Sequence, residues 1–553
     1  MSFCRNISQQ ISLDDTLYGL TERENKVLKK SWAEEFSNTI FPLINEERFS
    51  VLYSNNPASR PNNPVNVYMG LLMLKDIFTQ SDEEAIHSLY FDVRYQHALH
   101  TTSFKEQPVS KNSLSNFRSL VYEYYEKHGK DLIQEEIESH AKEFSKILNI
   151  DGRTIRMDSL MVSSSCKKLS RLEIIYSCNE RLIKEIQKEN PDILPDNLKV
   201  YLQEGYRNDT IYRSRDRDLD SKLKALASDS IELYYLCKDR AVEKTEAFSI
   251  LTRMLGEQTN NIDGIVGIKP AKEISPESLQ NPTDPDATYR IKSGKGHIGY
   301  VANIEETFDD KHKIITGYDL QQNTYSDQKF SKDTINKLGK QEDKTTIVVD
   351  GAYYSQDLSE EAKENNIDLI PTGLTGRPIK NENKGFEKFI IDEKEHKVLM
   401  CPMGHRPVKS TFKNGTYTAH FDKETCNDCP YFSDCPLKEQ KKRYYFQVTD
   451  TKFNRAKLMA RMETDEYKKI ANLRAGVEGI PSVLRRRYNV DHMPVRGKVR
   501  TKINFGLKVS AINCKRLIKS RLDSKKKALA SFIHRYLLKI FCCQGTISAF
   551  VVD

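Results

Sequence analysis

The stretch TTIVVDGAYYS, Thr345 to Ser355, joins a run of strand-forming residues to an Asp-Gly pair. Asp-Gly often closes a hairpin, but a hairpin needs a second alternating strand after the turn. The next residues, QDLSEEAKENN from Gln356 to Asn366, instead have the composition of a helix that opens with acids. We therefore expect Asp350 at the carboxyl end of a buried strand, where α/β sheets tend to place their chemistry.

Strand and helix patterns alternate on both sides of this stretch. After the Asp151-Gly152 turn, apolar residues alternate with polar neighbours around Asp158, which predicts a strand. Further strand patterns occur at residues 296–308, from 313 onward and at 367–373, and helical spacing occupies residues 169–257 and 456–487. This order predicts a mixed α/β core that carries inserted pieces.

The N-terminal part of the chain has a different pattern. Residues 20–147 carry apolar side chains three to four positions apart, which predicts a helical domain. Within it, residues 110–122 form a candidate recognition helix with Ser113 or Ser115 and Arg118 on its exposed face, because short polar side chains and an arginine suit DNA contacts. A plain bundle helix is the alternative, because no clear turn signature precedes the segment.

The composition is that of a globular protein with a polar surface. Hydrophobic residues make up 38% and charged residues 30% of the 553 residues, and apolar runs such as residues 67–74 are too short to span a membrane. The N-terminus lacks the apolar segment of a signal peptide, so we expect a cytoplasmic protein and no membrane partner. The eleven cysteines do not form an extracellular disulfide framework, and we expect reduced thiols.

Positive charge is concentrated near the C-terminus. Residues 485–527 contain fifteen Lys or Arg residues against Asp491 and Asp523, whereas the whole chain has a net charge of only +8. Such a region is typical of nucleic-acid binding, because neutralised phosphates release counterions. A solvated helix face is the alternative.

Three acids stand out by position: Asp158 inside a predicted strand, Asp350 at the end of another, and Glu478 in RAGVEGIPSVLRRR. Two-metal phosphoryl transfer needs such a set, because Mg²⁺ or Mn²⁺ ions take oxygen ligands held on rigid elements. Taken one at a time, each acid has a simpler interpretation as a helix cap, an Asx turn or a solvated side chain. A fold that brings the three acids together would favour the metal site over these separate, simpler interpretations.

An ordered set of segments resembles the bacterial insertion-sequence transposases of the DDE type. The segments run from residue 40 to 520 and are RPNNPVNVYMGLLMLKDIF, DGRTIRMDS, DPDATYRIKSGKGHIGY, VVDGAYYS, CPMGH, RAGVEGIPSVLRRR and VRGKVRTKINFGLKVSAINCKRL. The resemblance implies an α/β fold with a ribonuclease H-like mixed sheet, flanking helices, an all-α N-terminal domain and insertions. It also implies that Asp158, Asp350 and Glu478 are the catalytic acids and bind Mg²⁺ or Mn²⁺.

The segment around Glu478 is similar to the family's Tyr-x2-Arg-x3-Glu-x6-Lys signature. Arg474 and Arg485 occupy the two basic positions, with Arg485 in place of the lysine, and Ala471 replaces the tyrosine. Leu160 replaces a threonine that often follows the first acid by two positions. The offsets of four and seven predict one helical face on which both arginines meet DNA phosphate.

Two glycines, Gly476 and Gly479, flank the third acid within this predicted helix. Close approach of DNA, close approach of a neighbouring strand, or a kink near Pro481 would each explain them. The resemblance and the basic region also predict DNA contacts by Arg486, Arg496, Lys498 and Arg118.

The motif DPDATY offers a second pair of acids, Asp284 and Asp286, for which a proline-flanked loop is favoured over a metal site. From the resemblance, we expect that Lys295, His297 and Tyr300 contact DNA.

Four cysteines cluster in the segment that begins CPMGH. Cys426-x2-Cys429 is spaced to chelate Zn²⁺, with Cys401 and Cys435 as the remaining ligands and His405 as an alternative ligand. The other interpretation is a set of metal-free thiols in a small β insertion. The aromatic and basic residues nearby suit either DNA contact or packing against the core.

These observations predict a domain order and a function. The predicted segments are a helical DNA-binding domain at 1–147, the first part of the core at 148–380 with a helical insertion at 169–257, a Cys-rich insertion at 381–450, the core helix and basic part at 451–522, and a tail helix at 523–553. The resemblance implies metal-dependent DNA cleavage at element ends and strand transfer, by a nucleoid-associated homodimer bound to terminal inverted repeats and target DNA. The alternatives are an inactive transposase-derived DNA-binding protein and a metal-dependent nuclease without strand transfer.

Overall fold

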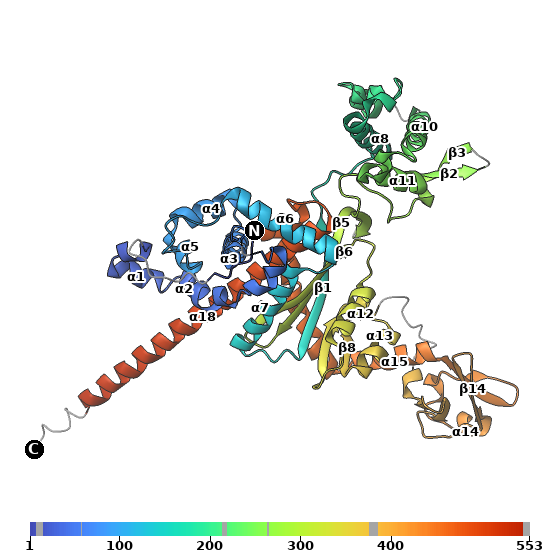
Figure 1. Ribbon diagram of the computed structural model, residues 1–553. Coiled ribbons are helices and arrows are strands. Elements are labelled where there is room, and N and C mark those ends of the chain that lie inside the picture. Colours follow the sequence, from blue (N-terminus) through green and yellow to red (C-terminus); the bar gives the residue numbers. More distant parts are fainter. Residues whose placement is uncertain are drawn as a thin grey trace, which may run out of the picture. The chain divides into compact units, whose positions relative to one another are not determined.

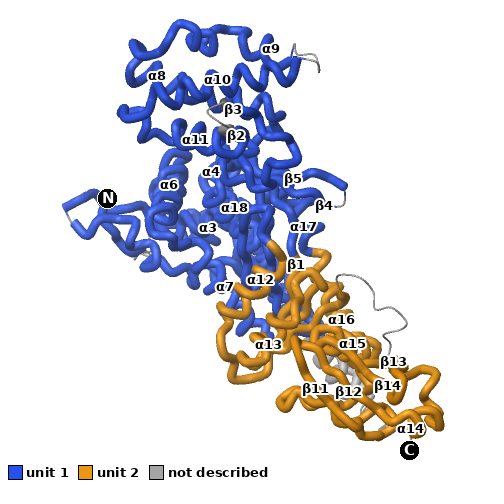
Figure 2. Tube along the Cα trace, turned by 90° about the vertical axis from the view of Figure 1, so that its right-hand side faces the viewer, with its two compact units in different colours: residues 1–151, 159–325, 480–553 blue, residues 152–158, 326–479 orange. Residues whose placement is uncertain are grey.

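The computed structural model describes residues 1–6, 15–56, 58–212, 218–262, 265–292, 294–374 and 385–545. The chain divides into two units, which Figure 2 colours separately. Unit 1 comprises Met1–Asp151, Ser159–Tyr325 and Ile480–Asp553, and unit 2 comprises Gly152–Asp158 and Ser326–Gly479. The predicted boundary at 380/381 and the last eight residues of the predicted tail, 546–553, lie outside the described residues.

The N-terminal part of unit 1 is helical, as its periodicity predicts. Its helices are α1 (Glu22–Leu28), α2 (Trp32–Glu35), α3 (Val65–Phe78), α4 (Asp82–Phe91), α5 (Val93–Ala98), α6 (Lys111–His128) and α7 (Leu132–Leu148). Capping boxes at Ser81 and Ser110 begin α4 and α6, and Gly129 and Asn149 end α6 and α7 in the left-handed conformation. Candidate helix 110–122 is therefore the first part of α6.

Unit 1 also contains the predicted helical insertion, which has its own hydrophobic core around Ile175, Leu182 and Leu251. Its helices are α8 (Arg171–Glu189), α9 (Tyr206–Ile211), α10 (Leu219–Cys237) and α11 (Glu246–Gln258), and α8, α10 and α11 form one group in Figure 1. A hairpin of β2 (Thr259–Ile262) and β3 (Ile265–Ile268) follows, which the sequence patterns did not predict.

A six-stranded mixed sheet places the protein in the α/β class. Its strands are β1 (Thr154–Ser163), β4 (Thr288–Lys292), β5 (Lys295–Phe308), β6 (Lys313–Gln322), β7 (Thr345–Val349) and β8 (Ile367–Pro371). The hydrogen-bonded order is β4-β5-β1-β7-β8, and β6 also pairs with β5. The pairs β1/β7 and β7/β8 are parallel, whereas β4/β5 and β5/β6 are antiparallel.

Within unit 2, two helices flank strand β7 along the chain. Helix α12 (Asp327–Leu338) precedes β7, and α13 (Gln356–Glu364) connects β7 to β8, as the sequence predicts. The crossover through α13 keeps β7 and β8 parallel. Asp350 follows the last residue of β7, Val349, which confirms its expected place at the carboxyl end of a buried strand.

The cysteine segment of unit 2 is a small β structure with its own aromatic core. Phe389 stacks on Phe446, with ring centroids 3.9 Å apart, and Phe421 packs beside them. The strands are β9 (Ile390–Asp392), β10 (Lys397–Met400), β11 (Lys409–Lys413), β12 (Thr416–Asp422), β13 (Lys438–Glu439) and β14 (Arg443–Thr449), with the short helix α14 (Lys423–Asn427).

The predicted long helix at 456–487 is wrong as a single element. The structure has α15 (Asp450–Met462), α16 (Asp465–Asn472), a 3₁₀ turn (Leu473–Val477) and α17 (Gly479–Tyr488). Thr464 begins α16 as an N-cap, and the two glycines around Glu478 lower the helical propensity where the 3₁₀ turn replaces an α-helix.

Helix α18 (Lys498–Gly545) ends the described chain, in unit 1. It packs against α3, α7 and β6, and it buries Ile503, Phe505 and Val509. Among the described residues, no helix combines the length and apolar character needed to cross a bilayer.

Candidate active site

Three elements of unit 2 position the three predicted acids. Asp158 lies on β1, Asp350 follows β7 and caps a 3₁₀ turn, and Glu478 lies between the 3₁₀ turn Leu473–Val477 and α17. The parallel pairing of β1 with β7 brings the first two elements together, and the 3₁₀ turn packs against β7. The fold therefore joins acids that are far apart in the sequence.

The three carboxylates converge on one cation, the guanidinium of Arg474. Its Nη2 lies 3.2 Å from Asp158 Oδ1 and 4.0 Å from Asp350 Oδ2, and its Nη1 donates to Glu478 Oε1 at 3.3 Å. The Arg474–Glu478 pair joins residues four positions apart. The predicted single helical face for Arg474 and Arg485 is wrong, because Arg474 lies in the 3₁₀ turn and Arg485 lies on α17.

The arginine is far more buried than two of the three carboxylates around it. The side chain of Arg474 is 13% exposed, and its Nε is buried without a hydrogen-bond partner among the described residues. Asp158 is 19% exposed, whereas Asp350 and Glu478 are 56% and 64% exposed. Two of the three carboxylates therefore face solvent, where a substrate or an ion has access to them.

Close backbone contacts support the site on two sides. Arg156, buried on β1, donates from Nη1 to the carbonyl of Leu473 at 2.6 Å, and an added Cβ at Gly476 would lie 2.1 Å from the same nitrogen. An added Cβ at Gly351 would lie 2.5 Å from the carbonyl oxygen of Gly373. Gly351 therefore allows two chain segments to approach beside Asp350.

Arg156 was not identified from the sequence as part of the site. It precedes Asp158 by two positions on the same strand, so the alternation of β side chains places both on one face of the sheet. That spacing is the signal that would have identified it.

The donor set suits a hard divalent cation, because all its ligand atoms are carboxylate oxygens. In this structure the positive charge among them is that of Arg474. Over the described parts of the chain, no three or more His, Cys, Asp or Glu side chains are arranged to hold a metal ion. The acids are thus gathered around a guanidinium. Their carboxylate oxygens are the type of ligand atom that a hard divalent cation prefers.

The predicted DNA-binding residues lie in unit 1, with the exception of Arg474. Arg486 and Arg496 are exposed, Arg485 Nε lies 3.5 Å from Asp491, and Lys498 donates to Gln321 at 2.7 Å. Arg118 forms a two-pronged ion pair with Asp82.

Part of the basic region stabilises the fold. Lys502 lies 2.8 Å from Asp319, Lys508 lies 3.3 Å from Asp76, and Arg516 lies 2.8 Å from the buried Glu306. These cations of α18 are bound to carboxylates of unit 1, so the excess of positive charge at 485–527 overstates the charge available to DNA.

The DPDATY motif forms a structural site. Asp284 is fully buried and accepts hydrogen bonds from Ser164 Oγ, from Tyr300 OH at 2.6 Å and from the Gly497 amide at 3.0 Å. Asp286 is exposed, so the two acids do not act as a pair. The expectation that Tyr300 contacts DNA is wrong, because its side chain is buried against Asp284; Lys295 is exposed and His297 is half-buried.

The four cysteines of the insertion border one small cavity. Cys401, Cys426, Cys429 and Cys435 line a space of about 10 Å³ together with His405. The turn after Cys401 is closed by the His405 amide, which donates to Cys401 Sγ at 3.3 Å, and by the Cys401 amide, which donates to the His405 carbonyl at 2.9 Å. Burial, followed by the neighbouring thiols, raises the pKa of Cys426 to about 11 and of Cys435 to about 12.

Comparison with known families supports the resemblance. Residues 400–518 match the family model described as the transposase DDE domain, which includes the cysteine segment, Arg474 and Glu478 but not Asp158 or Asp350. Neither a curated protein nor a solved structure matches the chain. The match supports a transposase-type function, and the family in general binds DNA and uses divalent metal ions. The match of residues 400–518 to the transposase DDE domain therefore confirms the resemblance of this chain to the DDE transposases.

Proposed function

We propose that the protein is a transposase that cuts DNA at the ends of its own element and joins the freed 3′-hydroxyl to target DNA. The observation that carries this proposal is the convergence of Asp158, Asp350 and Glu478, from three separate elements, on one guanidinium. The match of residues 400–518 to the transposase DDE domain supports it independently.

In this proposal, Asp158, Asp350 and Glu478 hold Mg²⁺ or Mn²⁺. A bound pair of such ions supplies activation of the attacking oxygen and stabilisation of the leaving oxygen of a phosphodiester. The chain itself contributes position and charge: the parallel strands fix the two aspartates, and the packing of Arg156 against Gly476 fixes the segment that carries Glu478. Catalysis of this kind depends mainly on such preorganisation.

Arg474 has a double role in the proposal. Without metal, its charge keeps three like-charged groups close together. With DNA present, the same planar group suits a scissile phosphate, because guanidinium and phosphate form paired hydrogen bonds. We further propose that Arg485, Arg486, Arg496, Lys498 and Arg118 contribute DNA contacts, as the sequence predicts.

We infer a ribonuclease H-like core from the arrangement of the sheet. Central strand β1 carries the first acid and has the parallel strand β7, which ends at the second acid, as its neighbour. The antiparallel pair β5/β6 continues the sheet from the other edge of β1. This mixed sheet, with acids on adjacent parallel strands, supports the inference.

We also propose structural Zn²⁺ in the cysteine insertion. The support is the shared cavity of the four thiols and the turn that aims the His405 amide at Cys401 Sγ. A homodimer on paired inverted repeats, in the bacterial nucleoid, completes the proposal and follows from the family resemblance.

The central experiment combines labelled element-end DNA, Mg²⁺ and purified full-length protein. The wild type is expected to nick the DNA at the element end and to give products joined to a target plasmid. Asp350→Asn and Glu478→Gln remove a metal-binding carboxylate while keeping the side-chain shape, so we expect loss of cleavage by a factor of at least about 10³. DNA binding should remain close to that of the wild type.

The same experiment tests the two alternatives. If the wild type binds without nicking and Asp350→Asn behaves identically, the protein is a DNA-binding protein without catalysis. If cut ends form but joined products never appear, the activity is that of a nuclease. Asp286→Asn is the matched control, because Asp286 is exposed and lies outside the acidic cluster; it should cleave like the wild type.

A further inference from the structure

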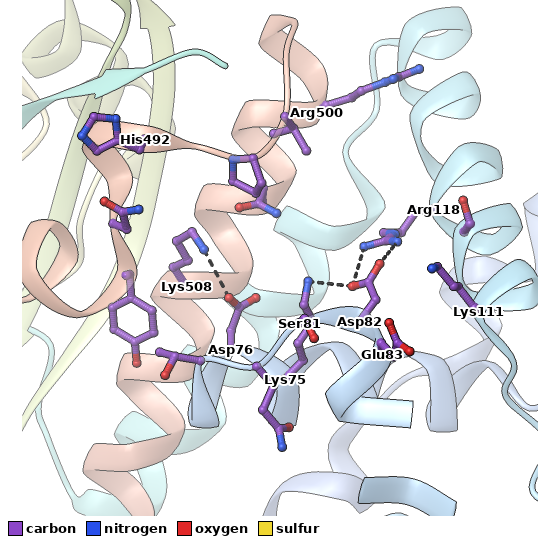
Figure 3. Close-up of a pocket in the computed structure, with 18 of the residues that line it drawn as sticks. Lys75, Asp76, Ser81, Asp82, Glu83, Lys111, Arg118, His492, Arg500 and Lys508 are labelled. Atoms are coloured by element: carbon purple, nitrogen blue, oxygen red, sulfur yellow. Dashed lines mark hydrogen bonds and ion pairs between the residues drawn. The ribbon is translucent and has the colours of Figure 1, made fainter. Parts of the chain in front are cut away.

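A cavity of about 770 Å³ opens within unit 1, and its lining does not include Asp158, Asp350 or Glu478. Its walls come from the α3–α4 junction, from α6, and from α17 with the first turns of α18. Figure 3 shows side chains from these elements pointing into a common space. Segments from both ends of the chain therefore build one site.

The charged side chains that line the cavity are predominantly basic. Six are Lys or Arg, against the carboxylates of Asp76, Asp82 and Glu83. The side chains lining the cavity are otherwise largely polar, including Ser115, Ser119 and Asn489. A polar, basic lining excludes an apolar ligand and favours an anion.

Two of the acids already have cationic partners. Asp82 lies between Lys75, at 2.7 Å, and Arg118, as the dashed lines in Figure 3 show, and Asp76 lies 3.3 Å from Lys508. Burial acts to raise the pKa of Asp82, but hydrogen bonds from Arg118 and Lys75 outweigh it and lower that pKa. These three cations are thus fixed internally, and they brace the wall of the cavity.

The remaining three cations have no such partner. Lys111, Arg487 and Arg500 are exposed, and none of them forms an ion pair with a described residue. They come from three different elements: Lys111 begins α6, Arg487 lies on α17 and Arg500 lies in the first turn of α18. The guanidinium of Arg500 lies over the ring of Tyr122, 5.4 Å from its centroid, which restricts its orientation.

We propose that this cavity binds the phosphodiester backbone of DNA, with Lys111, Arg487 and Arg500 as the phosphate contacts. The inference rests on the proposed function, and it assigns part of the DNA-binding surface to residues that the sequence analysis did not select. Three separate cations on different elements suit successive phosphates of a strand better than one compact anion. Arg118, already proposed as a DNA contact, is held by Asp82 and also supports the wall of the cavity.

The test measures binding of full-length protein to a fluorescent 30-base-pair duplex of arbitrary sequence, in chelator, across a series of salt concentrations. Arbitrary sequence is sufficient because phosphate contacts are independent of sequence. Lys111→Ala, Arg487→Ala and Arg500→Ala should each weaken binding by a factor of about 3–10. Each should also reduce the slope of log affinity against log salt by about 0.9, and the triple variant by about three times as much.

Matched controls remove the same charges elsewhere in the N-terminal helices. Lys142 on α7 and Arg23 on α1 are exposed, have no ion pair with a described residue and do not line the cavity. Lys142→Ala and Arg23→Ala should leave affinity and salt slope unchanged. Thermal unfolding of all variants should match the wild type, because none of the three cavity cations forms an ion pair with a described residue.

The inference is overturned if the triple variant binds with the affinity and salt slope of the controls. It is also overturned if DNA binding is unchanged while the thermal stabilisation given by inorganic phosphate is lost, because the cavity would then be a site for small anions. The assay contains no divalent metal, so it is separate from catalysis. If the wild type binds DNA and the triple variant does not, the site is upheld even if no cleavage occurs. If the triple variant binds and cleaves DNA like the wild type, the site is refuted and the proposed function still stands.

Discussion

At Gly476, an added Cβ would lie 2.1 Å from the guanidinium of Arg156, so only glycine leaves room for that arginine. The sequence offered three explanations for the glycines around Glu478: DNA, a neighbouring strand, or a kink. The structure assigns Gly476 to the neighbouring strand, because Arg156 reaches it from β1. At Gly479 no atom of the described residues lies within 4 Å of the added Cβ, so the two glycines have different causes.

This difference gives a prediction at the residue scale. Gly476→Ala should lower the free energy of unfolding by about 1–3 kcal/mol, because it overpacks the contact with Arg156. Cleavage should fall as well, because the same contact positions the segment of Glu478. Gly479→Ala is the matched control and should change stability by no more than about 1 kcal/mol. Urea titration measures the free energy of unfolding of both variants. Equal losses of stability in the two variants would contradict the assigned contact.

At the scale of elements, the cysteine insertion combines a hydrophobic core with a cluster of thiols. The stacked rings of Phe389 and Phe446 hold the small sheet together without any metal. The thiols lie to one side, around their own cavity. A metal there would stabilise a structure that already has a core.

The prediction is that the purified protein contains about one Zn²⁺ per chain. Cys426→Ser and Cys429→Ser should lose the metal, whereas Cys4→Ser, at an exposed cysteine outside the cluster, should retain it. Elemental analysis of protein purified without chelator measures this. Absence of metal from the wild type would contradict the site.

The pKa values of the thiols set the expected pH dependence of zinc binding. Burial raises the pKa of Cys426 to about 11 and of Cys435 to about 12, so both are protonated near neutral pH in the metal-free protein. Zinc binds thiolates, so binding releases these protons, and the affinity should fall as the pH is lowered. Competition with a chromophoric chelator at pH 6 and pH 8 would measure the change.

At the scale of the whole molecule, unit 1 is assembled from segments that are distant in the sequence. Asp284 connects three of them: Ser164 after β1, Tyr300 on β5 and Gly497 before α18. Its carboxylate is fully buried, so each of these donors depends on it. The two acids of DPDATY therefore differ completely in role, although they are two residues apart.

Asp284→Ala should accordingly lower the free energy of unfolding by about 3–5 kcal/mol, because it leaves buried donors without an acceptor. Asp286→Ala, at the exposed neighbouring acid, should change it by less than about 0.5 kcal/mol. Calorimetry or urea titration measures the difference. A mild effect at Asp284 would show that the three segments are held together by other contacts.

The local patterns of the sequence predicted most elements of the sheet and the N-terminal helices. Alternation and helical spacing are properties of neighbouring residues, so β5, β7, α13 and α6 follow from them directly. The same reasoning failed at residues 456–487, where an apolar spacing typical of one helix continues across two glycines that break it. It also overlooked the short β2–β3 hairpin.

Sequence by itself determined which residues are candidates for the chemistry: the three acids, Arg474 and the four cysteines are recognisable from residue type, order and spacing. Only the tertiary structure decided which of them meet, because parallel pairing of β1 with β7 and the broken helix before α17 bring Asp158, Asp350 and Glu478 to one guanidinium. It also decided which charges remain available. Lys508 and Arg516 are engaged by carboxylates distant in the chain, whereas Lys111, Arg487 and Arg500 form no ion pair with the residues that the structure describes. Such long-range ion pairing leaves no trace in the local sequence.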